Sequence, residues 1–467
     1  MADTSSASVH DGALERFLSE TAERRLEAYK ALLRIPSISG IPAHAPDCRA
    51  AAEFIAQDYR KAGMEHVEIS ETGGHPVVYA DWLHAHGKPT VLVYAHYDVQ
   101  PVDPEDLWDS PPFVPVVKDG KMLARGSSDC KCHVAMHARA IEALMATRKA
   151  LPVNLKLVIE GEEESSSLHL DAWLEANKDR LKADFAVISD TSFFEGNLPA
   201  ITVALRGIVS FQIDVYGSKI DLHSGVYGGA VNNPINALCQ IVAALKGTDG
   251  RIKVPGFYDD VVPLTERDRK AFADLPFDQE AYRESIGVPA FFGEPGYSIL
   301  EQEGARPTLD VNGIWGGFEG EGAKTIIPAH AHAKITSRIV SNQNPERIFE
   351  LISAYVAEIA PKSIRYEIKR LGDGGPSLTP IDYPPTQAAA RALEATFGNA
   401  PLYIREGGSV PVCASFESIL GLKTVLLGFA PADGQFHAPN EWMWMSNFET
   451  GIRTIARYWD EIAGLKL

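Results

Sequence analysis

Acidic and imidazole side chains gather in short islands that lie far apart along the chain. The islands are HYDVQP (96–101), SSDCK (127–131), EGEEESSS (160–167) and QFHAPNE (435–441), and Asp190 in VISD adds a fifth. All except SSDCK follow, directly or within several residues, a short apolar run rich in β-branched residues. Groups that follow the carboxyl ends of parallel strands converge on one crevice of an open sheet. The spacing therefore predicts that the islands form one site.

The islands supply two imidazoles and three carboxylates that could bind metal, and these are His96, Asp129, Glu164, Asp190 and His437. This set is sufficient for two divalent cations that share one ligand, and two adjacent cations depress the pKa of a water between them. Nitrogen and oxygen ligands without thiolate favour zinc and also suit manganese or cobalt. Each residue alone could instead be a turn residue, a helix-start acid or a solvated charge. The order and placement of the whole set favour a two-metal hydrolase site.

The apolar runs also predict the elements that must position this site. TVLVYA, NLKLVI, FAVI and TVLLGF have strand character and alternate with helical stretches such as 132–146 and 169–181. Amphipathic helices are expected at 13–34, 49–63 and 447–465. This alternation predicts an α/β catalytic domain with a mainly parallel central sheet flanked by helices.

From about residue 204 the pattern changes. Strands are expected at 206–217, 330–340 and 363–371, with helices at 234–247 and from Pro345, while 249–304 predicts loops and short helices. One helix carries apolar residues at helical spacing, which predicts a buried stripe of Ile348, Leu351, Ile352, Tyr355, Val356 and Ile359. We expect an α+β two-layer domain at 204–382, inserted into a discontinuous domain of 1–203 and 383–467.

Composition excludes several classes of function. The chain has 467 residues, a formal net charge of -18 and a pI near 5.3, which argues against nucleic acid as a partner. No leader pattern or apolar stretch of membrane-span length is present in the sequence, so no membrane association and a cytoplasmic location are expected. Five scattered cysteines predict no disulfide framework.

Six motifs in order resemble one known family of dinuclear metallopeptidases. They are HYDVQP, EGEEESSS, DLHSGVYGG (221–229), KTIIPA with TSRIVSNQ (324–343), REGGSVPV (405–412) and FHAPNE. The family includes carnosinases, cytosolic nonspecific dipeptidases, aminoacylases and succinyl-diaminopimelate desuccinylases, and the loop DLHSGVYGG is most similar to the dipeptidase branch. The resemblance implies an enzyme that cleaves dipeptides or short peptides with a free carboxylate.

The resemblance also implies a role for each matching residue. His96 and Asp190 would bind one metal, Glu164 and His437 the other, and Asp129 would bridge them. Glu163 would be the general base, and Asp98 would orient the His96 imidazole.

The remaining implied roles concern the substrate and the partner subunit. In a homodimer, His223 would reach into the partner subunit's site and stabilise the tetrahedral oxyanion. The substrate carboxylate would be bound by Arg338, ranked above Arg405, with Thr325, Gly408 and Ser409 adding contacts.

The sequence departs from the family pattern beside the expected bridge. Family members usually continue with Asp or Asn and then Lys-Gly, whereas this chain has Asp129, Cys130, Lys131 and Cys132. The family pattern also implies a cis peptide between Asp129 and Cys130. The two thiols are either small packing residues, as the buried habit of free cysteine favours, or Cys130 contacts or redox-modulates the metals.

Three other functions stay open at this point. The same machinery could cleave N-acyl or N-carbamoyl amino acids, so the expected substrate is a small peptide or an N-acylated amino acid. A cysteine hydrolase could use Cys130 or Cys132 with a histidine. The chain could also be a noncatalytic metal-binding homologue.

Overall fold

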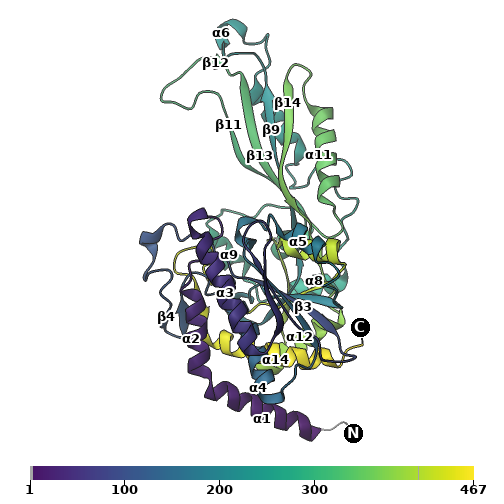
Figure 1. Ribbon diagram of the computed structural model, residues 1–467. Helices are drawn as coiled ribbons and strands as arrows, with labels where there is room; N and C mark the ends of the chain where they lie inside the picture. Colours follow the sequence, from purple (N-terminus) through teal and green to yellow (C-terminus); the bar gives the residue numbers. More distant parts are fainter. Residues whose placement is uncertain (1–3, 409, 467) are drawn as a thin grey trace. The chain divides into compact units, whose positions relative to one another are not determined.

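The computed structural model of the chain describes residues 4–408 and 410–466, which fold into two compact units (Figure 1). Unit 1 consists of residues up to 203, 379–404 and 415 onward, and unit 2 of 204–378 and 405–414. The first unit resumes at 379 rather than at the expected 383, and residues 405–414 belong to the second. The roles expected for the two domains stay predictions.

The large sheet is parallel in its centre and antiparallel at its margins. Its order is β1-β2-β6-β3-β7-β17-β8-β15, and β16 pairs with β8. The neighbours β6, β3, β7 and β17 run parallel. Strands β1 and β2 are antiparallel to each other and β2 to β6, and β8 is antiparallel to β17 and β15. The strand bounds are β1 Glu65–Ser70, β2 Val77–Trp82, β3 Thr90–His96, β6 Asn154–Glu160, β7 Phe185–Ile188, β8 Ala200–Leu205, β15 Ser377–Leu378, β16 Leu402–Glu406 and β17 Thr424–Leu426. The predicted α/β fold with a mainly parallel sheet is confirmed.

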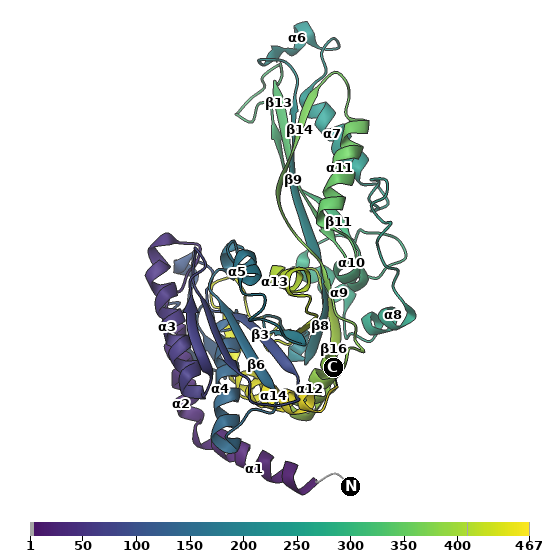
Figure 2. The same cartoon turned by 45° about the vertical axis from the view of Figure 1, so that its right-hand side comes forward.

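The central strands read as continuous apolar runs because helices cover the sheet. In β3 and β6 every residue after the first is buried, as is typical of parallel strands enclosed on both faces. Helices α3, α4, α12 and α14 pack around this sheet and against one another (Figure 2). Their bounds are α3 Ala45–Ala62, α4 Lys131–Arg148, α12 Pro384–Phe397 and α14 Met445–Ala463.

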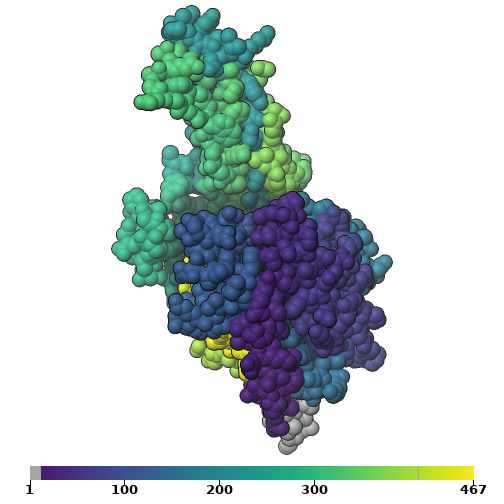
Figure 3. All heavy atoms as spheres, turned by 60° about the vertical axis from the view of Figure 1, so that its left-hand side comes forward, coloured from purple at the N-terminus to yellow at the C-terminus, as the bar shows by residue number. Residues whose placement is uncertain are grey.

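The N-terminal helices differ from the expected ones in their ends. The single helix expected over 13–34 is two helices, α1 (Thr4–Glu20) and α2 (Ala22–Leu33), separated at Thr21. The next helix, α3, starts at Ala45 rather than 49 and ends before Gly63, whose φ of +105° suits a glycine after a helix. Figure 3 shows the purple N-terminal residues beside the blue segment around 100–125 on one face of unit 1.

Unit 2 is a four-stranded antiparallel sheet, ordered β11-β13-β9-β14, with α7 and α11 packed on it. The sequence did not indicate β11, whose exposed residues break its alternation. On α11, Ile348, Ile352 and Val356 are fully buried, and each such burial contributes about 1.5–3 kcal/mol. The other three residues of the expected stripe, Leu351, Tyr355 and Ile359, are only partly buried. The bounds are β9 Gly207–Tyr216, β11 Thr308–Gly316, β13 His330–Ile339, β14 Arg365–Gly374, α7 Pro234–Leu245 and α11 Pro345–Ile359.

The segment 249–304 consists of loops and three short helices, α8 Glu266–Ala273, α9 Gln279–Ile286 and α10 Ile299–Ala305. All five cysteines lie in the described part of the chain, and none of them forms a disulfide there. Within residues 4–408 and 410–466, every helix is too short or too polar to span a bilayer.

Candidate metal centre

The five predicted metal ligands come together in unit 1, at the carboxyl ends of its parallel strands. His96 is the last residue of β3, and Asp190 lies two residues after β7. Glu164 lies in a short 3-10 helix, η3 (Glu163–Ser165), just after β6. Asp129 comes from the turn before α4, and His437 from the loop between β17 and β18 (Trp442–Trp444). Because β6, β3 and β7 are adjacent and parallel, their ends deliver three of the five ligands to one place.

Asp129 lies between the two imidazoles. Its Oδ1 is 3.0 Å from Nε2 of His96, and its Oδ2 is 3.0 Å from Nε2 of His437. On the first side, His96 Nε2 is also 3.3 Å from Oδ1 of Asp190. On the other, His437 Nε2 is 3.3 Å from Oε2 of Glu164. One carboxylate therefore connects two histidine–carboxylate pairs, which is the arrangement of a shared ligand between two cations.

Neighbouring charges shift the pKa values of the residues in this cluster. Burial alone would raise the pKa of Asp129, but hydrogen bonds from His437 and His96 lower it below its usual value. Hydrogen bonds to Asp129 and Glu164 raise the pKa of His437 to about 10. Burial opposes the charged form of His96, yet the charge of Asp190 and its other acidic neighbours raise the pKa of that imidazole well above its usual value. Closely spaced carboxylates favour positively charged partners, and oxygen and nitrogen donors bind divalent cations. The donor set therefore suits two metal ions.

Asp98 joins both sides of the cluster. It is fully buried, and its Oδ1 lies 3.3 Å from Nδ1 of His96. The same carboxylate accepts the backbone N–H groups of Glu163 at 3.2 Å and of Glu164 at 3.0 Å. Ser39 Oγ donates a further hydrogen bond of 2.6 Å to it. Asp98 therefore orients an imidazole and a ligand-bearing turn at once.

Glu163, the expected general base, has a carboxyl with a raised pKa. Burial raises its pKa to about 9, with the charges of Asp190 and Glu164 adding to the effect and that of His96 opposing it. A carboxyl whose pKa is raised by burial and by neighbouring acids has the properties of a general acid–base group.

Glu441 is a buried member of the site that sequence reasoning missed. Its carboxylate is inaccessible to solvent and accepts the backbone N–H groups of Gly126 (2.9 Å), Ser128 (2.7 Å) and Asp129 (3.0 Å). Arg125, 1% exposed, donates to it at 2.9 Å. Glu441 therefore fixes the turn that presents Asp129. Its presence in FHAPNE was the only signal, because spacing does not reveal which turn a distant acid will hold.

His437 itself has a φ of +59°, in the left-handed region that non-glycine residues rarely adopt. The loop that carries it is anchored where β18 pairs with β5 (Lys121–Leu123) and where Ala124 N–H donates to the carbonyl of Glu441 at 3.1 Å. Such backbone outliers cluster at functional sites.

The remaining predicted residues belong to unit 2. His223 is exposed in β10 (Leu222–His223) and accepts the N–H of Gly225 at 2.9 Å. Thr325 lies nearby, since its carbonyl accepts the N–H of Ser224 at 3.0 Å. Arg338, on β13, lines a cavity of about 450 Å³ inside this unit.

Arg405 on β16 forms an ion pair with the carboxylate of Asp268, which also belongs to unit 2. Gly408 follows in the same part of the chain, and Ser409 lies outside the described residues. Arg338 and Arg405 thus occupy different surroundings, which the sequence alone could not distinguish.

The peptide between Asp129 and Cys130 is cis, as expected. The thiols of Cys130 and Cys132 are fully buried, and burial raises the pKa of both well above the usual value. A nucleophilic cysteine needs a lowered pKa and access to substrate. These surroundings disfavour the cysteine-hydrolase alternative.

Comparison with known proteins gives a family match and full-length relatives. The sequence profile of peptidase family M20/M25/M40 matches residues 92–461. A Cys-Gly metallodipeptidase of Schizosaccharomyces pombe is 32% identical over 447 residues, covering 92% of this chain and 94% of that protein. A human Beta-Ala-His dipeptidase is 34% identical over 395 residues, covering 84% of this chain and 78% of that protein.

Solved structures agree in fold. The crystal structure of human carnosine dipeptidase 1 superposes with a TM-score of 0.78 at 30% identity, covering 98% of this chain and 99% of that one. An M20 family metallo-carboxypeptidase from Sulfolobus solfataricus reaches a TM-score of 0.81 at 30% identity, covering 94% and 99% of the two chains.

Proposed function

The chain belongs to peptidase family M20/M25/M40, and from this premise we propose that it is a dinuclear metallopeptidase that hydrolyses dipeptides. The observation that carries the proposal is Asp129, whose two oxygens each lie 3.0 Å from a different histidine. Relatives that match most of the chain are named as dipeptidases. These names support peptide substrates over the N-acyl or N-carbamoyl amino acids that the sequence left open.

We assign His96 and Asp190 to one metal ion, His437 and Glu164 to the other, and Asp129 to both. Zinc suits these nitrogen and oxygen donors, with manganese or cobalt as alternatives. When bound, two such ions polarise the scissile carbonyl and lower the pKa of the attacking water.

Glu163 is the proposed general base. Its carboxylate accepts the proton of the attacking water and later delivers it to the leaving amine nitrogen. Its pKa of about 9 reflects burial and surrounding acids, and nearby cationic charge would return that pKa toward neutrality. Asp98 keeps Glu163 in place by accepting its backbone N–H.

Substrate recognition is proposed for unit 2. Arg338 is the first candidate to bind the free carboxylate bidentately, with Thr325, Arg405, Gly408 and Ser409 as further contacts. We also propose a homodimer in which His223 acts in the partner subunit's site. The motif resemblance supports both proposals, and the cavity lined by Arg338 supports the first.

Glu163→Gln tests the proposal because the amide keeps the shape of the side chain and cannot accept the proton. Turnover of a Cys-Gly or β-Ala-His dipeptide should fall by about 10²–10⁴-fold, with two bound metal ions retained by elemental analysis. The matched control is Glu162→Gln, whose carboxylate contacts His169 at 2.9 Å instead of the ligand set. That variant should keep near wild-type turnover. Unchanged turnover in Glu163→Gln refutes the assignment, and hydrolysis of N-acyl or N-carbamoyl amino acids but not of dipeptides refutes the substrate class.

A further inference from the structure

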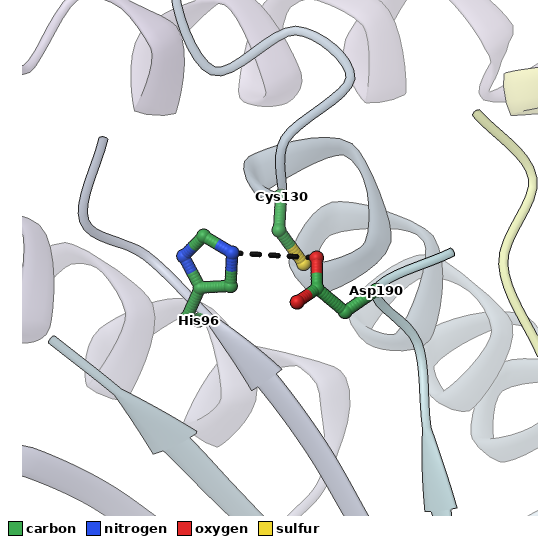
Figure 4. A group of neighbouring side chains, drawn as sticks. All are labelled: His96, Cys130 and Asp190. Atoms are coloured by element: carbon green, nitrogen blue, oxygen red, sulfur yellow. Dashed lines mark ion pairs between the residues drawn. The ribbon is translucent and has the colours of Figure 1, made fainter. Parts of the chain in front are cut away.

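We propose that Cys130 supplies a sulfur ligand to the metal ion held by His96 and Asp190, an inference that rests on the proposed function. One donor atom each from these three residues lies within 4.8 Å of the others. Figure 4 shows the sulfur directed toward the Asp190 carboxylate, beside the imidazole of His96. His96 and Cys130 are fully buried. The cluster therefore offers sulfur, nitrogen and oxygen to one point.

The local chain explains why the thiol faces this side. Cys130 follows Asp129 directly, at the N-cap position of α4. Its thiol donates a hydrogen bond of 3.0 Å to the carbonyl of Ser189, the residue before Asp190. The thiol therefore lies at the β7 end of the site, in one cluster with His96 and Asp190.

A neighbouring histidine contacts the same sulfur. Nε2 of His133 accepts the backbone N–H of Phe429 at 2.9 Å, so the proton of a neutral ring must sit on Nδ1. That Nδ1 lies 3.5 Å from Sγ of Cys130. A ring N–H that contacts a metal-binding atom from outside the ligand set fixes the orientation of that atom. The contact between His133 and Cys130 is of this kind.

Cys132 provides the internal comparison. It is also fully buried and its Sγ lies 3.4 Å from the same Nδ1 of His133. Both thiols donate to a backbone carbonyl, Cys130 to that of Ser189 at 3.0 Å and Cys132 to that of Ser128 at 3.2 Å, but Cys132 is not among the clustered donors. The two thiols share a helix end and a histidine but differ in whether they reach the ligand set.

The assignment makes the two metal positions chemically unequal. On the His96 side the donors would be nitrogen, oxygen and sulfur, while the His437 side has nitrogen and oxygen alone. Thiolate favours zinc over manganese. Because only the His96 side would have sulfur, we expect the first zinc ion to bind there. Binding of the sulfur would release the thiol proton to solvent and leave the electron pair of the S–H bond on Sγ for donation to the metal, with no oxidant or reductant involved.

Cobalt loading tests this directly, because thiolate bound to Co²⁺ gives a sulfur-to-metal charge-transfer band in the near ultraviolet. Metal-free wild-type protein titrated with Co²⁺ should develop the band during the first equivalent. Cys130→Ser should lose it, and Cys132→Ser should keep it. The affinity of the Cys130→Ser variant for its first zinc ion should also fall by at least about 10-fold, as is typical when a partner of a metal site is removed.

X-ray absorption of zinc-loaded wild-type protein needs no variant and should show a sulfur neighbour at about 2.3 Å. Two bound cobalt ions without the band, or zinc with only nitrogen and oxygen neighbours, would overturn the inference while leaving the dinuclear centre standing. A protein that binds no metal at all would instead refute the proposed function. A band that persists in Cys130→Ser also rejects Cys130.

Discussion

Glu441→Gln should expose how strongly the turn before α4 depends on one buried carboxylate. That carboxylate accepts four hydrogen bonds, three from backbone N–H groups and one from Arg125. Glutamine keeps one acceptor oxygen, but its NH₂ group would face two hydrogen-bond donors. The substitution also leaves the guanidinium of Arg125, which is 1% exposed, without its counter-charge. Breaking a buried pair in this way costs about 3–5 kcal/mol. Because the turn presents Asp129, zinc affinity should fall by about 10–100-fold as well.

Urea unfolding of the metal-free protein and competition titration with a zinc chelator measure the two effects. The control is Glu461→Gln, which loses a partly exposed ion pair with Arg391 and should cost less than about 1 kcal/mol. Adding Arg125→Met to Glu441→Gln should cost less than the sum of the single changes, since both buried charges are then gone. A Glu441→Gln protein as stable as the control, with wild-type zinc affinity, would refute the positioning role.

Two other predictions follow from single contacts. His437→Ala removes the imidazole that faces Glu164, so the variant should bind one metal ion tightly by elemental analysis, and two tightly bound ions would contradict the ligand assignment. Asp214 in unit 2 accepts hydrogen bonds from His332 and Lys369, which overcome burial and lower its pKa to about 2. A lowered folded-state pKa stabilises the protein above the unfolded value of 3.8, and this contribution is lost as pH falls through about 2. Asp214→Asn should therefore cost about 1–2 kcal/mol at pH 6 in urea unfolding, and a cost that does not shrink between pH 4 and pH 2 would show that the interaction is not ionic.

The sequence predicted which side chains lie close together where polar residues coincide with strand ends. His96, Glu164 and Asp190 follow buried apolar runs, so periodicity and the rule for parallel strands were sufficient to group them. The two remaining ligands depended on more. Asp129 precedes a helix instead of following a strand, and His437 lies eleven residues beyond the end of β17 in a loop with left-handed backbone.

Tertiary contacts explain what the sequence missed. Strand β11 was not indicated because an edge strand exposes much of its length and loses alternation. The helix over 13–34 divides at Thr21 although its apolar pattern continues. Residues 405–414 join unit 2 because Arg405 and its neighbours contact that unit, which no local pattern encodes.

The central claim is that two metal ions held around Asp129 carry out dipeptide hydrolysis. Removing metal with a chelator and then adding zinc in steps, with bound metal and hydrolysis of a Cys-Gly dipeptide measured on the same samples, tests it most directly. We expect hydrolysis to vanish with the metal and to recover fully as the second ion binds per chain. Undiminished hydrolysis by the metal-free protein, or full recovery with one ion, would contradict the account.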